Sequence, residues 1–299
     1  MTSSMRQAVL RWAVACLLVF GAAAAVAAAP RTFDTPEAAM NAFGAAVAAN
    51  DDEALKAMLG PDVHALIPPV GSDVRLRFLA AWADSHAVQP NGDTLARIAV
   101  GGDGWTLPIP LVKLAKGWQF DSDAGADEMR VRRIGRNERS AMQTLLAIRD
   151  AQLEYAAEDH DGDGILTYAS KLASSPGKRD GLYWPTKPGE KPSPLGASLA
   201  AAGGAKPGPQ GYHGYHYKLV TRQGAHASGG ALSYLVRGKL FGGFAVMAWP
   251  VRYQDTGVTS FLLSHDGQVY ERDLGPDTAK KAAATSSFDP GPGWNKVAP

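Results

Sequence analysis

The sequence has a single cysteine, Cys16, which lies inside an apolar stretch near the N-terminus. A chain with one cysteine forms no intramolecular disulfide, so its stability must come from a packed core. A dominant charge of one sign is also missing, since 30 Lys and Arg residues face 29 Asp and Glu residues. This balance gives no electrostatic reason to expect binding to nucleic acid or to an anionic membrane surface.

Several catalytic motifs are absent as well. The chain contains no Gly-x-Ser-x-Gly, no His-Glu-x-x-His, no phosphate-binding Gly-x4-Gly-Lys and no dinucleotide fingerprint. Beyond the N-terminal stretch, no apolar run is long enough to cross a bilayer. Carboxylate pairs for glycoside hydrolysis are not excluded, because such pairs form in space and leave no motif.

The N-terminal stretch has the pattern of a secretory signal peptide. Arg6 and Arg11 precede an unbroken apolar run that ends in small residues. Val26 and Ala28 fit the −3 and −1 positions of a cleavage site, so we expect residues 1–28 to be removed. The protein is then exported, periplasmic or extracellular, and has no transmembrane anchor after cleavage. A retained membrane anchor is the alternative, but the Ala and Gly residues in the second half of the run favour cleavage.

Residues 31–124 are predicted to form an N-terminal α+β domain. Thr35 or Asp34 can cap a helix that begins at Pro36, and Gly60 can end a second helix. After these helices the pattern changes to that of strands. The expected helices cover 36–49, 53–59 and 73–85, and the expected strands cover 95–100, 105–112 and 118–120.

The third of these helices is expected to bury Leu76, Leu79 and Trp82. Helices followed by an antiparallel meander that ends in "GWQFD" resemble the cone-shaped domain of the nuclear-transport-factor-like and cystatin-like superfamilies. This resemblance implies a cone-like fold and no particular activity.

Residues 125–299 are predicted to form a second α+β domain that begins with a helical block broken at Gly135. Helices are expected over 126–134 and 137–158, the second being the longest of the chain. Its buried stripe is expected to consist of Met142, Leu145, Leu146, Ile148, Leu153 and Tyr155.

Five arginines give this block a basic appearance. They are Arg130, Arg132, Arg133, Arg136 and Arg139. Because Asp127, Glu128 and Glu138 lie among them, we interpret the arginines as a solvated helical face with balanced charge.

The following region, 174–214, is rich in Gly and Pro. It contains Leu182, Tyr183 and Trp184, which a flexible linker would not carry, so we predict an ordered, packed loop. An antiparallel sheet is expected beyond it, with a hairpin turn at Asp266-Gly267. Its strands cover 215–221, 241–249, 258–264 and 268–273, and a helix over 276–284 follows.

A long helix, an acidic loop and an antiparallel sheet resemble the globular head of pilins and pseudopilins. The segments "AQLEYAAEDHDGDG", "GYHYKLV" and "TSFLLSHDGQVYERD" carry this likeness. Pilins connect such a module directly to a long N-terminal transmembrane helix, whereas a whole domain intervenes in this chain.

Several unusual words recur along the chain. They are "FDTPEAA", "RRIGRNE", "DGDG", "SPGKRDGLYWP", "SPLG", "YHGYHY", "AWPVRY" and "DLGPDTA". Together they resemble an exported bacterial family known as a domain of unknown function, number 2950. The resemblance covers nearly all of the chain after the leader and implies no reaction and no catalytic residues.

The acidic loop is a candidate calcium site. Carboxylates at alternate positions of a tight loop can converge on one ion. The candidate ligands are Asp159, Asp161, Asp163, the carbonyl of Ile165, and Thr167. Ser170 stands where a bidentate Glu is needed, so any calcium site is weak. The alternative is an acidic turn in which the aspartates cap backbone N–H groups.

A candidate ligand groove lies near the Gly/Pro-rich loop. Its residues are Asp180, Tyr183, Trp184, His213, Tyr215 and Trp249. Aromatic side chains with a few polar groups are typical of sugar or peptide clefts. The same residues can form a small core under the loop, which is the interpretation we favour. His213 and His216 do not suit zinc, because strand residues three apart point to opposite faces.

The sequence therefore predicts an uncharacterised exported soluble protein, a non-catalytic binding or assembly module of the periplasm or cell envelope. Its expected partner is an envelope protein or a small ligand, and no cofactor is required unless calcium binds. One alternative is an envelope hydrolase with a site near the central loop. The other is a weak calcium-binding structural or adhesion module.

Overall fold

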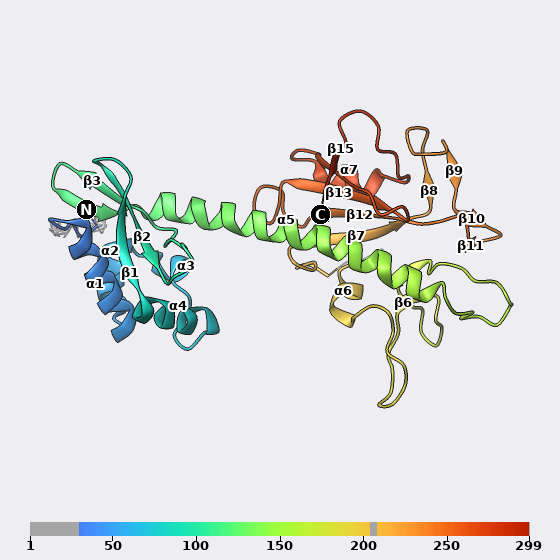
Figure 1. Ribbon diagram of the computed structural model, residues 1–299, viewed down its shortest axis with the longest axis horizontal. Coiled ribbons are helices and arrows are strands. Elements are labelled where there is room, and N and C mark those ends of the chain that lie inside the picture. Colours follow the sequence, from blue (N-terminus) through green and yellow to red (C-terminus); the bar gives the residue numbers. More distant parts are fainter. Residues whose placement is uncertain (1–29, 204–207, 299) are drawn as a thin grey trace, which may run out of the picture.

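The computed structural model describes residues 30–203 and 208–298. It has an α+β fold in which two lobes are connected by one long helix, α5 (Ser122–Tyr155), as Figure 1 shows. We call residues 30–121 the N-terminal lobe and residues 156–298 the C-terminal lobe. The predicted signal peptide lies outside the described residues. Among the described helices, none combines the length and the apolar character needed to cross a membrane.

The N-terminal lobe begins with the expected helices. Thr35 caps α1 by accepting a hydrogen bond from the N–H of Ala38 at 3.1 Å, and Gly60 ends α2. The helices are α1 (Pro36–Ala49), α2 (Asp52–Leu59), α3 (Val63–Leu66) and α4 (Asp73–Asp84). Gly44 lets α1 and α4 approach closely, since a Cβ there would lie 2.4 Å from the Trp82 ring.

One expectation for α4 is wrong. Leu76 is 55% exposed, whereas Leu79 and Trp82 pack against the core as expected. The fully buried residue of α4 is Arg75, which the sequence pattern did not single out. The apolar pattern predicts the wrong buried face of α4 because a charged side chain, Arg75, takes a position on the face that packs against the core.

An antiparallel meander follows, in the order β1-β2-β3-β4. The strands are β1 (His86–Pro90), β2 (Leu95–Val100), β3 (Leu111–Leu114) and β4 (Gly117–Phe120). The strand predicted over 105–112 is wrong: β3 begins only at Leu111, and a loop precedes it. Pro108 and Pro110 explain this, because proline has no N–H to donate to a strand ladder.

The helix α5 runs without a break through Gly135, so the predicted junction there is wrong. Its C-terminal half buries Leu145, Ile148 and Tyr155 as expected, but Leu153 is 42% exposed. Glycine disfavours a helix by only about 1 kcal/mol, and contacts of α5 with both lobes outweigh this cost.

Replacing Gly135 by Ala is expected to raise the free energy of unfolding by about 0.8 kcal/mol, because alanine loses less backbone entropy in a helix. A Cβ at this position meets open space. Urea unfolding measures the change. Gly125→Ala on the same helix is the control, and it should destabilise, because its Cβ would lie 2.8 Å from Ile109. A destabilised Gly135→Ala variant would contradict a continuous helix.

The C-terminal lobe is built on a five-stranded antiparallel sheet in the order β15-β14-β13-β12-β7. Its strands are β7 (Tyr215–Val220), β12 (Ala245–Pro250), β13 (Thr259–Ser264), β14 (Val269–Asp273) and β15 (Asn295–Val297). One face packs on α5, and the other packs under α7 (Thr278–Ala284). Both faces are covered, so every residue of the inner strand β12, which lies between β13 and β7, is buried.

Small elements surround this sheet. They are β5 (Lys171–Ala173), β6 (Gly181–Tyr183), α6 (Ala197–Ala201), β8 (Arg222–Gln223), β9 (Leu232–Ser233), β10 (Leu235–Val236) and β11 (Lys239–Leu240). Leu182, Trp184, Leu195 and Leu199 are buried, so these parts of the Gly/Pro-rich region pack against the lobe, as the sequence predicts, whereas residues 185–192 are exposed. Residues 204–207 lie outside the described chain.

Candidate functional site

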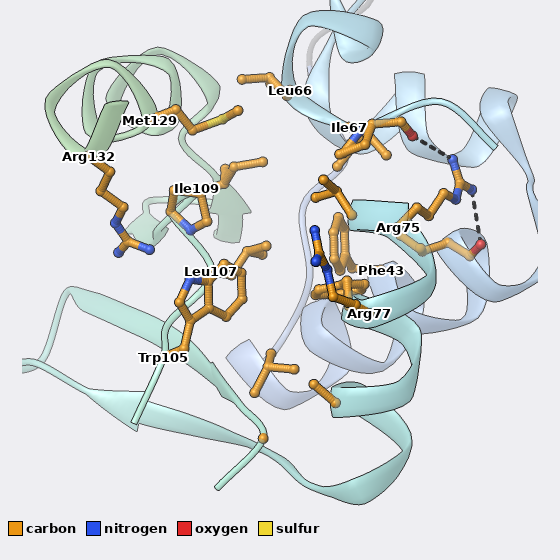
Figure 2. Close-up of a pocket in the computed structure, with 18 of the residues that line it drawn as sticks. Phe43, Leu66, Ile67, Arg75, Arg77, Trp105, Leu107, Ile109, Met129 and Arg132 are labelled. Carbon is orange, nitrogen blue, oxygen red and sulfur yellow. Dashed lines mark hydrogen bonds between the residues drawn. The ribbon is translucent and has the colours of Figure 1, made fainter. Parts of the chain in front are cut away.

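A cavity of about 690 Å³ opens in the N-terminal lobe beside the long helix (Figure 2). Its walls come from α1, the connection between α3 and α4, α4 itself, the loop between β2 and β3, and the first part of α5. A cavity of this size lies within the range of sites that enclose small organic ligands.

Most of the cavity wall is apolar. Phe43, Leu107 and Ile109 form buried wall, whereas Val74 is 55% exposed and Trp105 is 44% exposed. The other apolar lining residues are Val47, Leu66, Ile67, Pro68, Phe78, Ala81, Val100, Pro108 and Met129. Large apolar side chains that stay exposed around a cavity indicate a surface that a ligand can cover.

Arginines surround this apolar wall. Arg77 comes from α4 and Arg132 from α5, and Figure 2 shows them on opposite walls. Arg132 is fixed in place: its Nε donates to Glu128 at 2.8 Å, and a terminal nitrogen donates to the carbonyl of Thr106 at 2.6 Å. Its guanidinium also lies over the Trp105 ring, 5.8 Å from the centroid.

Besides the buried Arg75, two of the lining arginines have unneutralised charge. In the described part of the chain, no Asp or Glu oxygen lies within 4.0 Å of a side-chain nitrogen of Arg77 or Arg136. Arg133 pairs with Asp255 of the C-terminal lobe. Asp103 is the one carboxylate among the lining residues. The opening of the cavity is therefore positively charged.

A further arginine, Arg75, has a structural role. Only 4% of it is exposed, and Figure 2 shows its guanidinium turned away from the cavity toward two carbonyl oxygens. Its terminal nitrogens donate to Val47 at 3.0 Å and to Pro68 at 3.2 Å. Arg75 thus ties the end of α1 to the connection between α3 and α4, which holds two walls together.

No sequence pattern indicated this cavity, although the arginines of α5 stand out in the sequence. Arg130 pairs with Asp127 at 2.9 Å on the solvated face, as expected. Glu138, however, forms no ion pair with an arginine of the described residues, and it accepts the backbone N–H groups of Val258 and Thr259 instead. The spacing of Arg132 and Arg136 places them on one helix face. The residues that pack against this face are distant in the chain, so the local sequence does not predict them.

The six residues of the predicted groove are distributed differently. Tyr215 and Trp184 belong to the core between α5 and the sheet, and Tyr183 packs against that core. Trp249 lies on the other face of the sheet, near α7, and His213 is exposed in the turn before β7. Since the sheet stands between Tyr215 and Trp249, the six side chains do not share one groove.

Asp180, the sixth of these residues, closes the loop between β5 and β6. Its carboxylate accepts hydrogen bonds from Lys171 Nζ at 2.8 Å and from the Ser175 N–H at 2.7 Å. Burial alone would raise the pKa of Asp180, but the hydrogen bonds from Lys171 and Ser175 outweigh it and lower the pKa to about 2. The carboxylate stays ionised and stabilises the loop between β5 and β6 through these hydrogen bonds.

The acidic loop brings its three aspartates together. Carboxylate oxygens of Asp159, Asp161 and Asp163 lie within 4.8 Å of one another. Lys239 reaches the cluster, 2.6 Å from Asp161 and also paired with Asp163. The predicted ligand Ile165 is 47% exposed; Thr167, the last predicted ligand, is half-buried. A calcium ion would have to compete with the Lys239 ammonium, so calcium binding stays a prediction.

If calcium binds this loop, we expect it to raise the melting temperature of Lys239→Gln by about 2 °C or more relative to chelator. The effect on the wild type should be smaller, because its lysine competes for the same carboxylates. Melting curves with excess calcium and with chelator measure both. Asp161→Ala is the control without a site, and unchanged midpoints in all three proteins would dispose of the calcium prediction.

The chain was compared with known proteins as a whole. Residues 30–297 match a family described as "Protein of unknown function (DUF2950)", so the match covers both lobes. No curated protein and no solved structure matches the chain. The family predicted from the sequence words is thus confirmed, while export and the likeness to pilin heads stay predictions.

Proposed function

Because the chain belongs to the DUF2950 family, whose description assigns no activity, we propose a function from the cavity of the N-terminal lobe. The protein is an exported, non-catalytic binding module for a small amphipathic molecule that has an apolar body and an anionic group. One observation carries this proposal: an apolar cavity of about 690 Å³ whose opening is positively charged.

The apolar wall supports the first half of the proposal. Val74 and Trp105 line the cavity while exposed, and they lose contact with water when an apolar ligand enters. Burial of apolar surface contributes about 25 cal/mol per Å² before the cost of association is subtracted. An alkyl chain or a flat ring system therefore suits this wall.

The arginines support the second half. Arg77 and Arg136 lack acidic partners in the described chain, and arginine binds carboxylate or phosphate groups through parallel hydrogen bonds. An anionic group placed at the opening meets these arginines while the apolar body remains inside. The same charge disfavours a cationic amphiphile.

The lining favours binding over hydrolysis. Glycoside hydrolysis requires two carboxyl groups about 5 to 9 Å apart, whereas the described lining supplies only Asp103. The leader pattern with Arg6 and Arg11 supports export. A secreted binding module fits both features, and the envelope supplies amphipathic molecules as ligands.

Isothermal titration with three matched ligands tests the proposal. The purified protein should bind decanoate most tightly, decanol less tightly, and decyltrimethylammonium least, because they share one apolar chain and differ in charge. Replacing Arg77 and Arg136 together by Gln should weaken decanoate binding roughly tenfold, on the order of two exposed ion pairs. Decanol binding should not change.

Arg139→Gln is the matched control, since Arg139 is exposed on the same helix and does not line the cavity. It should bind all three ligands as the wild type does. Equal affinity for the three ligands would refute charge selection. If none of the three ligands binds, the proposed function is refuted.

A further inference from the structure

The cavity of the N-terminal lobe borders on a loop of the C-terminal lobe. Arg133 and Arg136 line the cavity from one turn of α5. Loop 252–257 docks on the same turn, where Asn137 donates to the carbonyl of Thr256 at 2.8 Å. Glu138, the next residue, accepts the N–H groups that follow this loop. The two lobes thus meet at the edge of the cavity.

Arg133 contacts both the cavity and the loop 252–257. It lines the cavity, yet its guanidinium donates to the Asp255 carboxylate and, at 3.2 Å, to the Asp255 carbonyl oxygen. The pair is partly open to solvent, with 46% of the Arg133 side chain and 34% of the Asp255 side chain exposed. An exposed pair of this kind is weak enough to exchange partners.

Asp255 has a second cation. Arg252 Nε donates to its other carboxylate oxygen at 2.5 Å, and this hydrogen bond, together with the charge of Arg133, holds the pKa of Asp255 below its usual range. When Arg133 leaves, Asp255 therefore remains ionised and paired. Since no carboxylate is left without a partner, the exchange costs little.

We propose that Asp255 sets the charge selectivity of the cavity by competing with the anionic group of the ligand for Arg133. This inference rests on the proposed function and makes Asp255 a specificity-determining residue that lies outside the cavity. A ligand with a weak or absent negative charge leaves Arg133 on Asp255. An anionic ligand withdraws Arg133 and so couples occupancy of one lobe to a loop of the other.

Asp255→Asn provides the test, by titration of decanoate and decanol. Removing the competing charge should tighten decanoate binding about two- to fivefold, the range expected for an exposed ion pair, and leave decanol binding unchanged. Asp127→Asn is the matched control. It removes a carboxylate of α5 that pairs with Arg130, and Arg130 does not line the cavity. It should change neither affinity.

Arg133→Gln completes a double-mutant cycle. Alone it should weaken decanoate binding, and in its presence Asp255→Asn should have no further effect. An unchanged ratio of decanoate to decanol affinity in Asp255→Asn, or wild-type decanoate binding by Arg133→Gln, would overturn the inference and leave the proposed function intact. Failure of the wild type to bind either ligand would instead remove the proposed function and the inference with it.

Discussion

Replacing Gln152 by Leu is expected to lower the free energy of unfolding by about 3 kcal/mol. The Gln152 side chain is fully buried on α5, and its amide makes two hydrogen bonds to one residue of the C-terminal lobe. Its Nε2 donates to the carbonyl of Ala169 at 2.9 Å, and its Oε1 accepts the Ala169 N–H at 2.8 Å. Leucine leaves both backbone groups buried without partners, at about 1–3 kcal/mol each.

Urea unfolding followed by tryptophan fluorescence measures this loss as a lower midpoint. Gln143→Leu is the matched control, since Gln143 is exposed on the same helix, and it should change stability by less than about 0.5 kcal/mol. Equal stability of the two variants would show that the Gln152 amide does not hold the segment before β5 against α5.

Replacing Gly257 by Ala is the second change with a large expected effect. A Cβ at this position would lie 2.1 Å from the hydroxyl oxygen of Tyr215 and 2.6 Å from the ring carbon that carries it. Tyr215 cannot move aside, because it is fully buried and its hydroxyl donates to the carbonyl of Thr259 at 2.8 Å. Overpacking of this kind should cost about 3 kcal/mol.

The same unfolding measurement applies. The control is Gly102→Ala, where a Cβ meets open space and the backbone is not left-handed, so stability should stay within about 0.5 kcal/mol of the wild type. Because Gly257 ends the loop that docks beside the cavity, Gly257→Ala should also disturb the Arg133–Asp255 pair. A Gly257→Ala protein as stable as the wild type would contradict the packing of Tyr215 under this loop.

Two features with a local cause were predicted correctly from the sequence. Thr35 and Pro36 start α1 because a hydroxyl cap and a fixed φ act within one turn. The Asp266-Gly267 turn joins β13 to β14 for the same kind of reason: Gly267 has φ 87°, and Asp266 accepts the N–H of Gln268 at 3.0 Å. The alternation and apolar runs of the strands likewise gave the α+β class.

Expectations that depended on distant partners were less secure. Gly135 was expected to break a helix that contacts with both lobes keep intact. Leu76 and Leu153 fit an apolar stripe, yet they remain exposed, because the inner face of each helix is set by what packs against it. The six residues of the candidate groove do not come together for a related reason, since β12 is covered on both faces and Trp249 faces α7.

The amino-acid sequence by itself determined the start of α1, the Asp266-Gly267 turn, the α+β class and the family, because each depends on residues that are neighbours in the chain. Only the tertiary structure decided where charge meets apolar surface. Arg77 and Arg136 are 59 positions apart, and they reach one cavity because α4 and α5 pack on opposite sides of it. This proximity results from tertiary packing, and no local sequence pattern predicts it.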